Sequence, residues 1–211
     1  MPGQNNEKPI LFSAPMVRAI LNGNKTMTRR VVPEKIVEKY YECDDMARSV
    51  AMPEGGTRLY EKNVFLPLAK YQPGDRLWVR ENYAVSHKFD ACRPREIPIK
   101  THVHYAADRE YGRDDSIGGL ILRPSIFMPR WASRITLEVT NVRVERVQDI
   151  SEADALAEGV DRTNTSLLGY AQERFKRLWD SINTKRGFGW SKNPWVWVYE
   201  FKVVNADAES K

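Results

Sequence analysis

The sequence predicts an α+β fold, a small curled β-sheet or barrel with helices on its outside. Three segments have the apolar period of helices, and they are set among five or more short segments with the alternation of strands. The 211 residues fit one domain with a proper core. We therefore expect a single domain over 1–211, with insertions at about 33–56 and 87–129, where mixed charge, Pro and Gly follow no steady period.

The helix signals lie at residues 13–22, 151–158 and 166–183. A Ser and a Pro begin the first range and Asn-Gly ends it, whereas a Ser N-cap begins the second and Gly159 ends it. The third range has apolar residues at a 4-3-4 spacing, which predicts one buried stripe of Ala171, Phe175, Leu178 and Ile182.

The strand signals come after turns or show apolar alternation. A Pro-Gly turn at 71–75 leads into a strand at 76–83. Residues 134–148 alternate with a break in phase at 140–141, which predicts a long bent or bulged strand, or a hairpin. The closing strand, 195–201, puts four aromatic side chains on one face, where core packing is favoured over base stacking.

Composition sets mild limits on function. A net charge of +5 favours an anionic partner such as a nucleotide or RNA. No apolar run approaches the length of about 18 residues that a membrane helix needs, and the first eight residues have no apolar signal core. We therefore expect a cytoplasmic protein without a membrane partner. The two cysteines support neither a disulfide framework nor a thiolate metal site.

The segment 23–30 gathers an amine, hydroxyls and guanidiniums just after a helix end. Lys25 and Thr28 are three residues apart, which brings an amine near a hydroxyl on a helical turn or across a turn that enters a strand. A Walker A phosphate loop is excluded, because Asn24 and Ala19 stand where that motif needs glycine. A solvated basic turn is the other interpretation.

Four separated blocks resemble one family. They are Gly23-x-Lys25-Thr26-x-Thr28-x-Arg30, the turn and strand at 73–79, the block from 136 to 158, and Val198-Tyr199-Glu200-Phe201. In order and chemistry they resemble the ASCH superfamily, which are β-barrel domains of the PUA-like fold. The two insertions have no counterpart in compact members of that superfamily.

Among the compact members, the chain is most similar to the bacterial N4-acetylcytidine amidohydrolases, which hydrolyse N4-acylated cytidine to cytidine and a carboxylate. The resemblance implies that Lys25, Thr28 and Glu158 are catalytic and that Arg30 belongs to the same motif. It implies a nucleoside substrate, and we expect neither a metal nor another cofactor.

These residue types suit amide cleavage. Thr28 can attack the acyl carbonyl if Lys25 accepts its proton, which requires burial or neighbouring cations such as Arg29 and Arg30 to lower the pKa of Lys25. Arg30 is also the first choice for stabilising the oxyanion. Glu158 either orients the amine or protonates the leaving nitrogen, and both roles stay open.

Two further groups are candidate ligand contacts. Trp78 could stack on a pyrimidine and Glu81 could accept a hydrogen bond from an exocyclic amine, although a core Trp beside a solvated Glu explains them equally well. His102 and His104, with His87 or Cys92, match no zinc spacing.

The alternative function is a non-catalytic PUA-like RNA-binding module, or a ribonuclease. Four arginines would then contact phosphates, and binding would weaken steeply with salt. They are Arg29, Arg30, Arg76 and Arg80. The sequence leaves acyl specificity and oligomeric state open.

Overall fold

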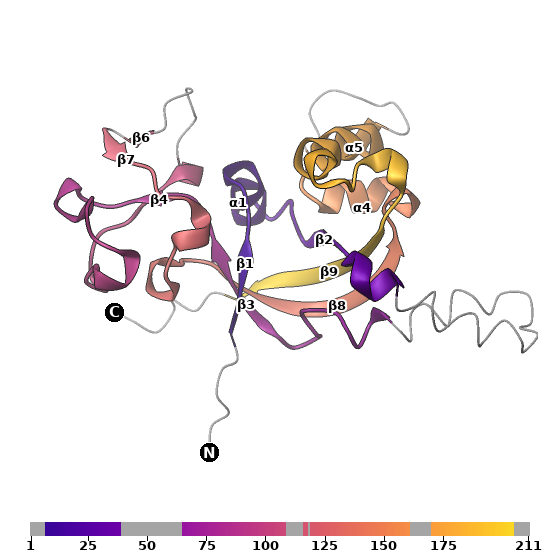
Figure 1. Ribbon diagram of the computed structural model, residues 1–211, viewed down its shortest axis with the longest axis horizontal. Coiled ribbons are helices and arrows are strands. Elements are labelled where there is room, and N and C mark those ends of the chain that lie inside the picture. Colours follow the sequence, from indigo (N-terminus) through magenta and orange to yellow (C-terminus); the bar gives the residue numbers. More distant parts are fainter. Residues whose placement is uncertain (1–6, 39–64, 109–115, 118, 161–169, 205–211) are drawn as a thin grey trace, which may run out of the picture. The chain divides into compact units, whose positions relative to one another are not determined.

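The computed structural model describes residues 7–38, 65–108, 116–117, 119–160 and 170–204 (Figure 1). The chain divides into two compact units, which we describe separately. Unit 1 comprises residues 1–24, 74–138 and 202–211, and unit 2 comprises residues 25–73 and 139–201. Within the described ranges, no helix is long and apolar enough to cross a membrane.

Five strands make the main sheet, in the order β1-β3-β8-β9-β2. β1 pairs with β3 in parallel, whereas β3 with β8 and β2 with β9 are antiparallel pairs. The strands are β1 (Lys8–Leu11), β2 (Met27–Val31), β3 (Arg76–Arg80), β8 (Thr136–Arg146) and β9 (Trp195–Val204).

The main sheet is open, so the predicted barrel is wrong. A barrel closes only when its two edge strands pair with each other, and no pairing joins β1 to β2 in the described part of the chain. These edge strands have only 4 and 5 residues, against 11 in β8 and 10 in β9. The α+β class holds.

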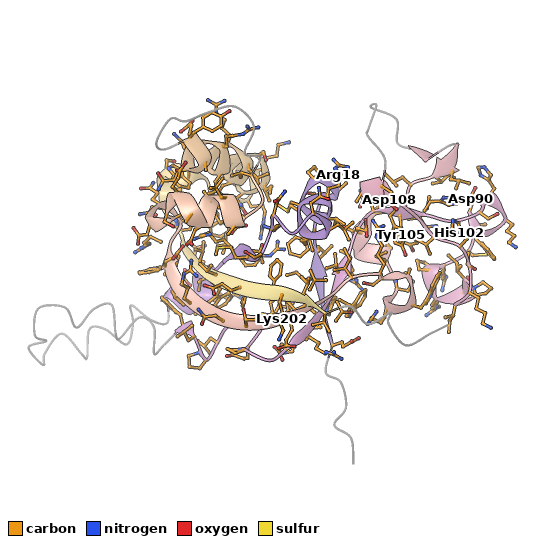
Figure 2. The ribbon with its side chains drawn as sticks, turned by 180° about the vertical axis from the view of Figure 1, so that it is seen from behind. Arg18, Asp90, His102, Tyr105, Asp108 and Lys202 are labelled. Atoms are coloured by element: carbon orange, nitrogen blue, oxygen red, sulfur yellow. The ribbon has the colours of Figure 1, made fainter. Side chains whose placement is uncertain are left out.

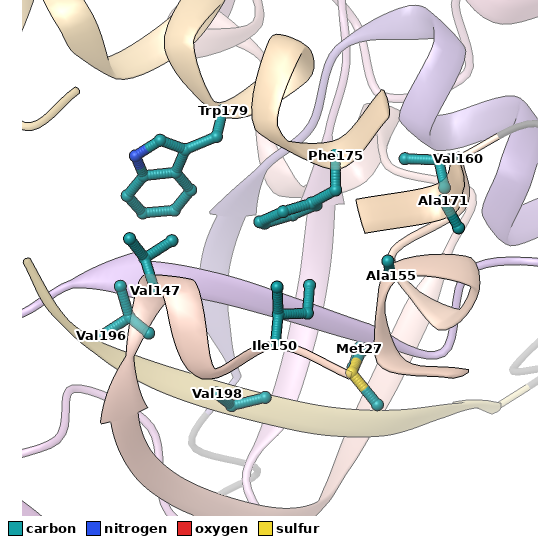
Figure 3. Packing of buried hydrophobic residues seen from close by; sticks show 10 residues of the cluster. All are labelled: Met27, Val147, Ile150, Ala155, Val160, Ala171, Phe175, Trp179, Val196 and Val198. Atoms are coloured by element: carbon teal, nitrogen blue, oxygen red, sulfur yellow. The ribbon is translucent and has the colours of Figure 1, made fainter. Parts of the chain in front are cut away.

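In unit 2, two helices cover the sheet face that β2 and β9 share. They are α4 (Glu152–Ala157) and α5 (Tyr170–Asn183). Figure 3 shows their apolar side chains meeting those of the strands in one cluster. The buried members are Met27, Val147, Ile150, Ala155, Val160, Ala171, Phe175, Trp179, Val196 and Val198.

The buried stripe of α5 differs in part from the expected one. Ala171 and Phe175 are buried as predicted, but Trp179 continues the stripe, and Ile182 is 43% exposed. Trp179 packs in the apolar cluster, and its indole N–H donates to the carbonyl of Phe188, 2.8 Å away, so its polar group has a partner in the buried position. The buried spacing is therefore i, i+4, i+8, with Leu178 packed at its margin.

The expected ends of α4 are confirmed. Ser151 Oγ accepts a hydrogen bond from the backbone N–H of Asp154 at 3.1 Å, which caps the first turn. Glu158 is the C-cap residue, and Gly159 comes next with a φ of 84°, a left-handed conformation that glycine adopts without steric cost. The cap therefore fixes where the Glu158 backbone stops being helical.

The long strand signals are resolved by the structure. Residues 136–146 form one continuous strand, so the hairpin alternative is wrong. All four aromatic side chains of the closing strand are buried, as core packing predicted. The predicted helix at 13–22 is α1 (Ala14–Leu21). Of the insertion at 33–56, residue 33 is in no helix or strand, residues 34–38 are helical, and residues 39–56 lie outside the described residues.

In unit 1, the described part of the insertion at 87–129 is more ordered than its composition suggested. It contributes to a second core cluster of Tyr83, Val85, Ile97, Met128 and Ala132. Short strand pairs and an isolated bridge frame it, from β4 (Tyr83–Ala84), β5 (His104–Tyr105), β6 (Ser116–Ile117) and β7 (Leu120–Ile121).

Single 3-10 turns complete the two units. Unit 1 has η1 (His87–Phe89), η2 (Pro94–Glu96), η3 (Ala106–Asp108), η4 (Ser125–Phe127) and η5 (Arg130–Ala132). Unit 2 has η6 (Val147–Asp149), η7 (Thr184–Arg186) and η8 (Trp190–Lys192).

Candidate active site

Lys25 and Glu158 meet in unit 2 at the start of β2 and the end of α4. The two residues form an isolated antiparallel bridge. Next to it, the N–H of Thr26 donates to the carbonyl of Ala157 at 2.9 Å, and the N–H of Phe201 donates to the carbonyl of Thr26 at 2.8 Å. The backbone on both sides of Lys25 and Glu158 is thus held by hydrogen bonds, which fixes the origin of both side chains.

The Lys25 amine is buried against the Glu158 carboxylate. Its Nζ donates to Glu158 Oε2 at 2.7 Å and to the Glu158 carbonyl at 2.8 Å. Lys25 is 1% exposed and Glu158 is 4% exposed. An ion pair at this depth is weakly screened by solvent, so each charge acts strongly on the other.

Arg29 holds the other oxygen of the same carboxylate. Its Nη1 donates to Glu158 Oε1 at 3.1 Å, and its Nη2 donates to Asp154 at 2.8 Å. Its Nε donates to Glu145 at 2.9 Å. The Arg29 side chain is fully buried, with its guanidinium carbon 5.6 Å from the centre of the Phe175 ring. Both carboxylate oxygens of Glu158 are therefore bound to cations.

The ion pairs extend along β8 and β9. Arg143 pairs with Glu145 at 3.2 Å, and it also donates to Asp154 and to Glu200. We call the whole set the unit 2 charge network. Its members are Lys25, Arg29, Arg143, Glu145, Asp154, Glu158 and Glu200.

The unit 2 charge network shifts the pKa of the Lys25 amine. Burial lowers the pKa of Lys25 below its ordinary value, Glu158 opposes that shift, and Arg30 and Arg29 add to it. The net direction is downward, which is the direction that the proposed role of Lys25 requires. Burial alone would also lower the pKa of Arg29, but Glu158 and Glu145 more than offset it, so the net shift there is upward.

Thr28 and Arg30 lie on the other face of β2. Thr28 is paired in register with Tyr199, and Arg30 with Trp197. Because side chains alternate along a strand, these four share one face, whereas Arg29 shares the face of the helices. Thr28 is buried, and no hydrogen bond joins its hydroxyl to any residue that the structure describes. The structure thus joins Lys25 directly to Glu158, whereas strand pairing places Thr28 on the face of β2 opposite to Arg29.

The Thr28 face has polar groups of its own. Burial lowers the pKa of the Arg30 guanidinium, which Tyr71 and Glu158 partly offset, although an arginine keeps its charge near neutral pH. The Tyr199 ring meets the Tyr71 ring edge-on, with 5.1 Å between centroids. Burial raises the pKa of the Tyr199 hydroxyl, and the backbone at Tyr71 and Lys70 opposes that shift in part.

Trp78 and Glu81, the other predicted ligand contacts, belong to unit 1. Trp78 is buried, and the guanidinium carbon of Arg80 lies 4.6 Å from its ring centre. Glu81 is buried and accepts two hydrogen bonds from Arg134, at 2.9 and 3.1 Å. Of the alternative interpretation, the core Trp is confirmed, but the solvated Glu is wrong, because Glu81 is a buried partner in an ion pair.

Sequence reasoning did not find Glu145 and Asp154. Asp154 and Glu158 are four residues apart, which puts both carboxylates on one face of α4. That spacing was a usable signal. Glu145 was not recognisable, because its role depends on β8 and β2 lying near the same helix, which no local pattern reveals.

Comparison with known proteins gives weak matches only. No protein-family model matches the chain, and no curated protein matches it. The solved structures that are similar to it include two proteins of low sequence identity. One is a protein from Enterococcus faecalis V583 of family model DUF984, with 12% identity and a TM-score of 0.38, covering 89% of this chain and 66% of that chain.

The other is an ASCH domain from Lactobacillus crispatus JV V101, with 15% identity and a TM-score of 0.39, covering 94% of this chain and 79% of that chain. The present chain spans slightly less than two thirds of the Enterococcus protein. Because both TM-scores are low, a functional assignment depends on the residues of this chain alone.

Proposed function

We propose that unit 2 is the catalytic part of an amidohydrolase that cleaves the N4-acyl amide of acylated cytosine nucleosides. One observation carries the proposal: a buried amine whose pKa is lowered stands 2.7 Å from a buried carboxylate. A solvated Lys has a pKa of about 10.4 and cannot accept a proton near neutral pH. A lowered pKa moves the Lys25 amine toward the neutral form that a general base needs.

In the proposed reaction, neutral Lys25 takes the proton of an attacking hydroxyl, and the oxygen forms a bond to the acyl carbon. The acyl C–N bond then breaks, and the N4 nitrogen leaves with a proton that the Lys25 ammonium returns. The products are cytidine and a carboxylate. One water molecule, which attacks directly or hydrolyses the Thr28 ester, supplies the second carboxylate oxygen, one proton that ends on N4 and one proton that is released to solvent. This cycle requires no metal and no other cofactor.

Glu158 is best suited to orienting the amine. Its two oxygens accept hydrogen bonds from Lys25 and Arg29, so the carboxylate is fixed from both sides. Arg29 is then a positioning residue for Glu158, since its donors are directed at carboxylates and its side chain is fully buried. We assign Arg30 to substrate, because it lies on the Thr28 face.

The attacking oxygen is Thr28 Oγ1 or a water molecule, and a double variant separates them. If Thr28 is the nucleophile, Lys25→Ala and Thr28→Ala each lower kcat by about 10² or more, and the double variant is little worse than either. If water attacks, Thr28→Ala keeps most of the activity. Acyl-enzyme captured by mass spectrometry, at Thr28 and not in Thr28→Ala, supports the first route.

The RNA-binding alternative has less support in unit 2. It assigns Arg29 to a phosphate, but that side chain is fully buried and is held by three carboxylates. Titration of labelled RNA at two salt concentrations separates the functions. Binding that weakens steeply with salt, without nucleoside turnover, favours the RNA-binding module.

The deciding assay mixes purified protein with N4-acetylcytidine in the presence of a chelator, and monitors cytidine release by absorbance. The matched control is Lys185→Ala, which removes an exposed ammonium from unit 2. We expect turnover by the wild type and by the control, and its loss in Lys25→Ala. Absence of turnover by folded protein, with longer acyl groups and the deoxynucleoside as well, would refute the enzyme proposal.

A further inference from the structure

Unit 1 contains a hollow with an unusual set of charges. It has a volume of about 360 Å³ and lies within the insertion at 87–129 and the residue just before it. Its lining combines two ammonium groups, two imidazoles and two hydroxyls with an aromatic ring and a proline. These residues are Ser86, Lys88, Phe89, Pro98, Lys100, Thr101, His102 and His104. His102 is labelled in Figure 2.

The hollow is positive. Among the described residues that line it, none is acidic. The nearest carboxylate along the chain, Asp90, lies outside the lining, with its Oδ2 3.3 Å from Nδ1 of His87. Asp108, four residues after His104, pairs with Arg134 at 2.7 Å. No acidic side chain of the lining therefore neutralises the charges of Lys88 and Lys100.

The walls of the hollow are held in place before any ligand arrives. Arg123 donates to the carbonyls of Phe89 and Cys92, which fixes the loop that carries Lys88. On the other side, β5 pairs with β4, so His104 is held opposite Ala84. Phe89 also packs against the core cluster of unit 1. A wall ordered in advance loses little conformational entropy on binding.

The hollow also offers a surface for a flat ring. The rings of His102 and His104 meet edge-on, with 4.6 Å between centroids, and the Phe89 ring stands in the same lining. The Lys88 ammonium lies 4.9 Å from the centre of the Phe89 ring. A cation next to an aromatic face suits a ligand that carries an anion beside a planar group.

We propose that this hollow binds a nucleotide of about mononucleotide size through its phosphate monoester. Lys88 and Lys100 contact the phosphate, the hydroxyls of Ser86 and Thr101 donate to it, and the base lies against Phe89. The volume is at the small end of the range for ligand pockets, about 300–1,000 Å³, which favours one nucleotide over a longer occupant. The ligand is a free nucleotide or the 5′-phosphorylated end of an RNA.

Isothermal titration calorimetry of the full chain with 5′-CMP, cytidine and inorganic phosphate tests this site without using any enzyme activity. We expect 5′-CMP to bind at least about tenfold more tightly than cytidine, and the binding to weaken with salt. A trinucleotide with and without a 5′-phosphate identifies the source. Tighter binding of the phosphorylated trinucleotide than of 5′-CMP assigns an RNA end, and the reverse assigns the free nucleotide.

Two double variants that remove equal charge decide whether this hollow is the site. Lys88→Ala with Lys100→Ala removes the proposed phosphate contacts, and Lys185→Ala with Lys192→Ala removes two exposed ammonium groups of unit 2. We expect the first to weaken 5′-CMP binding by about tenfold or more and the second by less than about twofold. Equal losses in both, or cytidine binding as tightly as 5′-CMP, would overturn the proposal.

Discussion

Among the described residues, each unit buries one carboxylate almost completely, and the cation that holds this carboxylate differs between the units. In unit 2, Glu158 is held by the Lys25 amine and by Arg29. In unit 1, Glu81 is held by the two-pronged guanidinium of Arg134. Lys25 is fully buried, whereas the Arg134 side chain is 23% exposed.

The identity of the cation decides which buried pair can move a proton. An arginine keeps its proton at any pH at which proteins fold, so Arg134 can only anchor Glu81. Arg134 also lies 3.9 Å from the Tyr105 ring centre and pairs with Asp108 (both labelled in Figure 2), which adds to its hold. A lysine amine can lose its proton when burial lowers its pKa, as at Lys25. We therefore assign chemistry to one pair and stability to the other.

Removing the anchor of Glu81 should give the largest effect. Arg134→Met leaves a buried carboxylate without its cation, which costs about 3–5 kcal/mol of unfolding free energy. Urea denaturation measures it as a lower midpoint. The matched control is Arg177→Met, since Arg177 is 79% exposed and its loss should cost less than about 0.5 kcal/mol. Equal effects from both would mean that Arg134 anchors nothing.

Removing the Lys25 amine should give the next largest effect, and this effect should be on catalysis. Lys25→Met should lower kcat/KM for N4-acetylcytidine by about 10² or more, because it removes the proton acceptor. Arg134→Met, assayed at a temperature where it is folded, should keep the wild-type kcat. Similar catalytic losses in both variants would remove the distinction between the two carboxylate pairs.

The sequence predicted the elements better than it predicted their partners. Local signals were sufficient for α4, since Ser151 and Gly159 define its ends through caps that act within one turn. They identified Arg29 and Arg30 as neighbours that lower the pKa of Lys25, but left the balance against Glu158 open. The unpredicted features need distant segments: Arg29 is buried by carboxylates of β8 and α4, and Trp179 turns inward toward the carbonyl of Phe188.

Strand parity explains what the family motif could not show. Lys25 and Thr28 are close in the motif, but β2 places Thr28 on the face opposite to Arg29. The open sheet also depends on segments that are far apart in the sequence. Closure depends on whether β1 and β2 meet, and short edge strands have no local sequence signal for that pairing.

The two pairs should also respond to pH in opposite directions. The folded pKa of Lys25 is lowered, so the unfolded chain binds more protons between that pKa and about 10.4, and stability rises with pH across this window. Burial raises the pKa of Glu81 despite Arg134, so stability falls as pH rises from about 4.5 through the folded pKa. Urea midpoints against pH, compared with Lys25→Met and Glu81→Gln, measure both slopes. If the slope of stability against pH in either window persists after Lys25→Met or Glu81→Gln, respectively, it does not come from the residue replaced.

The smallest effect should come from the cap of α4. Ser151→Ala removes the hydrogen bond to the Asp154 N–H and should cost about 1 kcal/mol of unfolding free energy. Ser151→Asp, which keeps an acceptor, should cost less. Because α4 carries Glu158 at its end, kcat should fall by a few fold in the Ala variant, and unchanged kcat with lower stability would show that the cap does not position Glu158.

The proton affinity of Lys25 is the most direct test of the assignment. Titration of the lysine side chains by NMR, with the Lys25 signal identified by its absence from Lys25→Met, gives the midpoint of that amine. We predict a midpoint below the ordinary lysine value of about 10.4, moving further down in Glu158→Gln because the opposing charge is removed. A midpoint at or above the ordinary value, unmoved by Glu158→Gln, would contradict the assignment of Lys25 as the base.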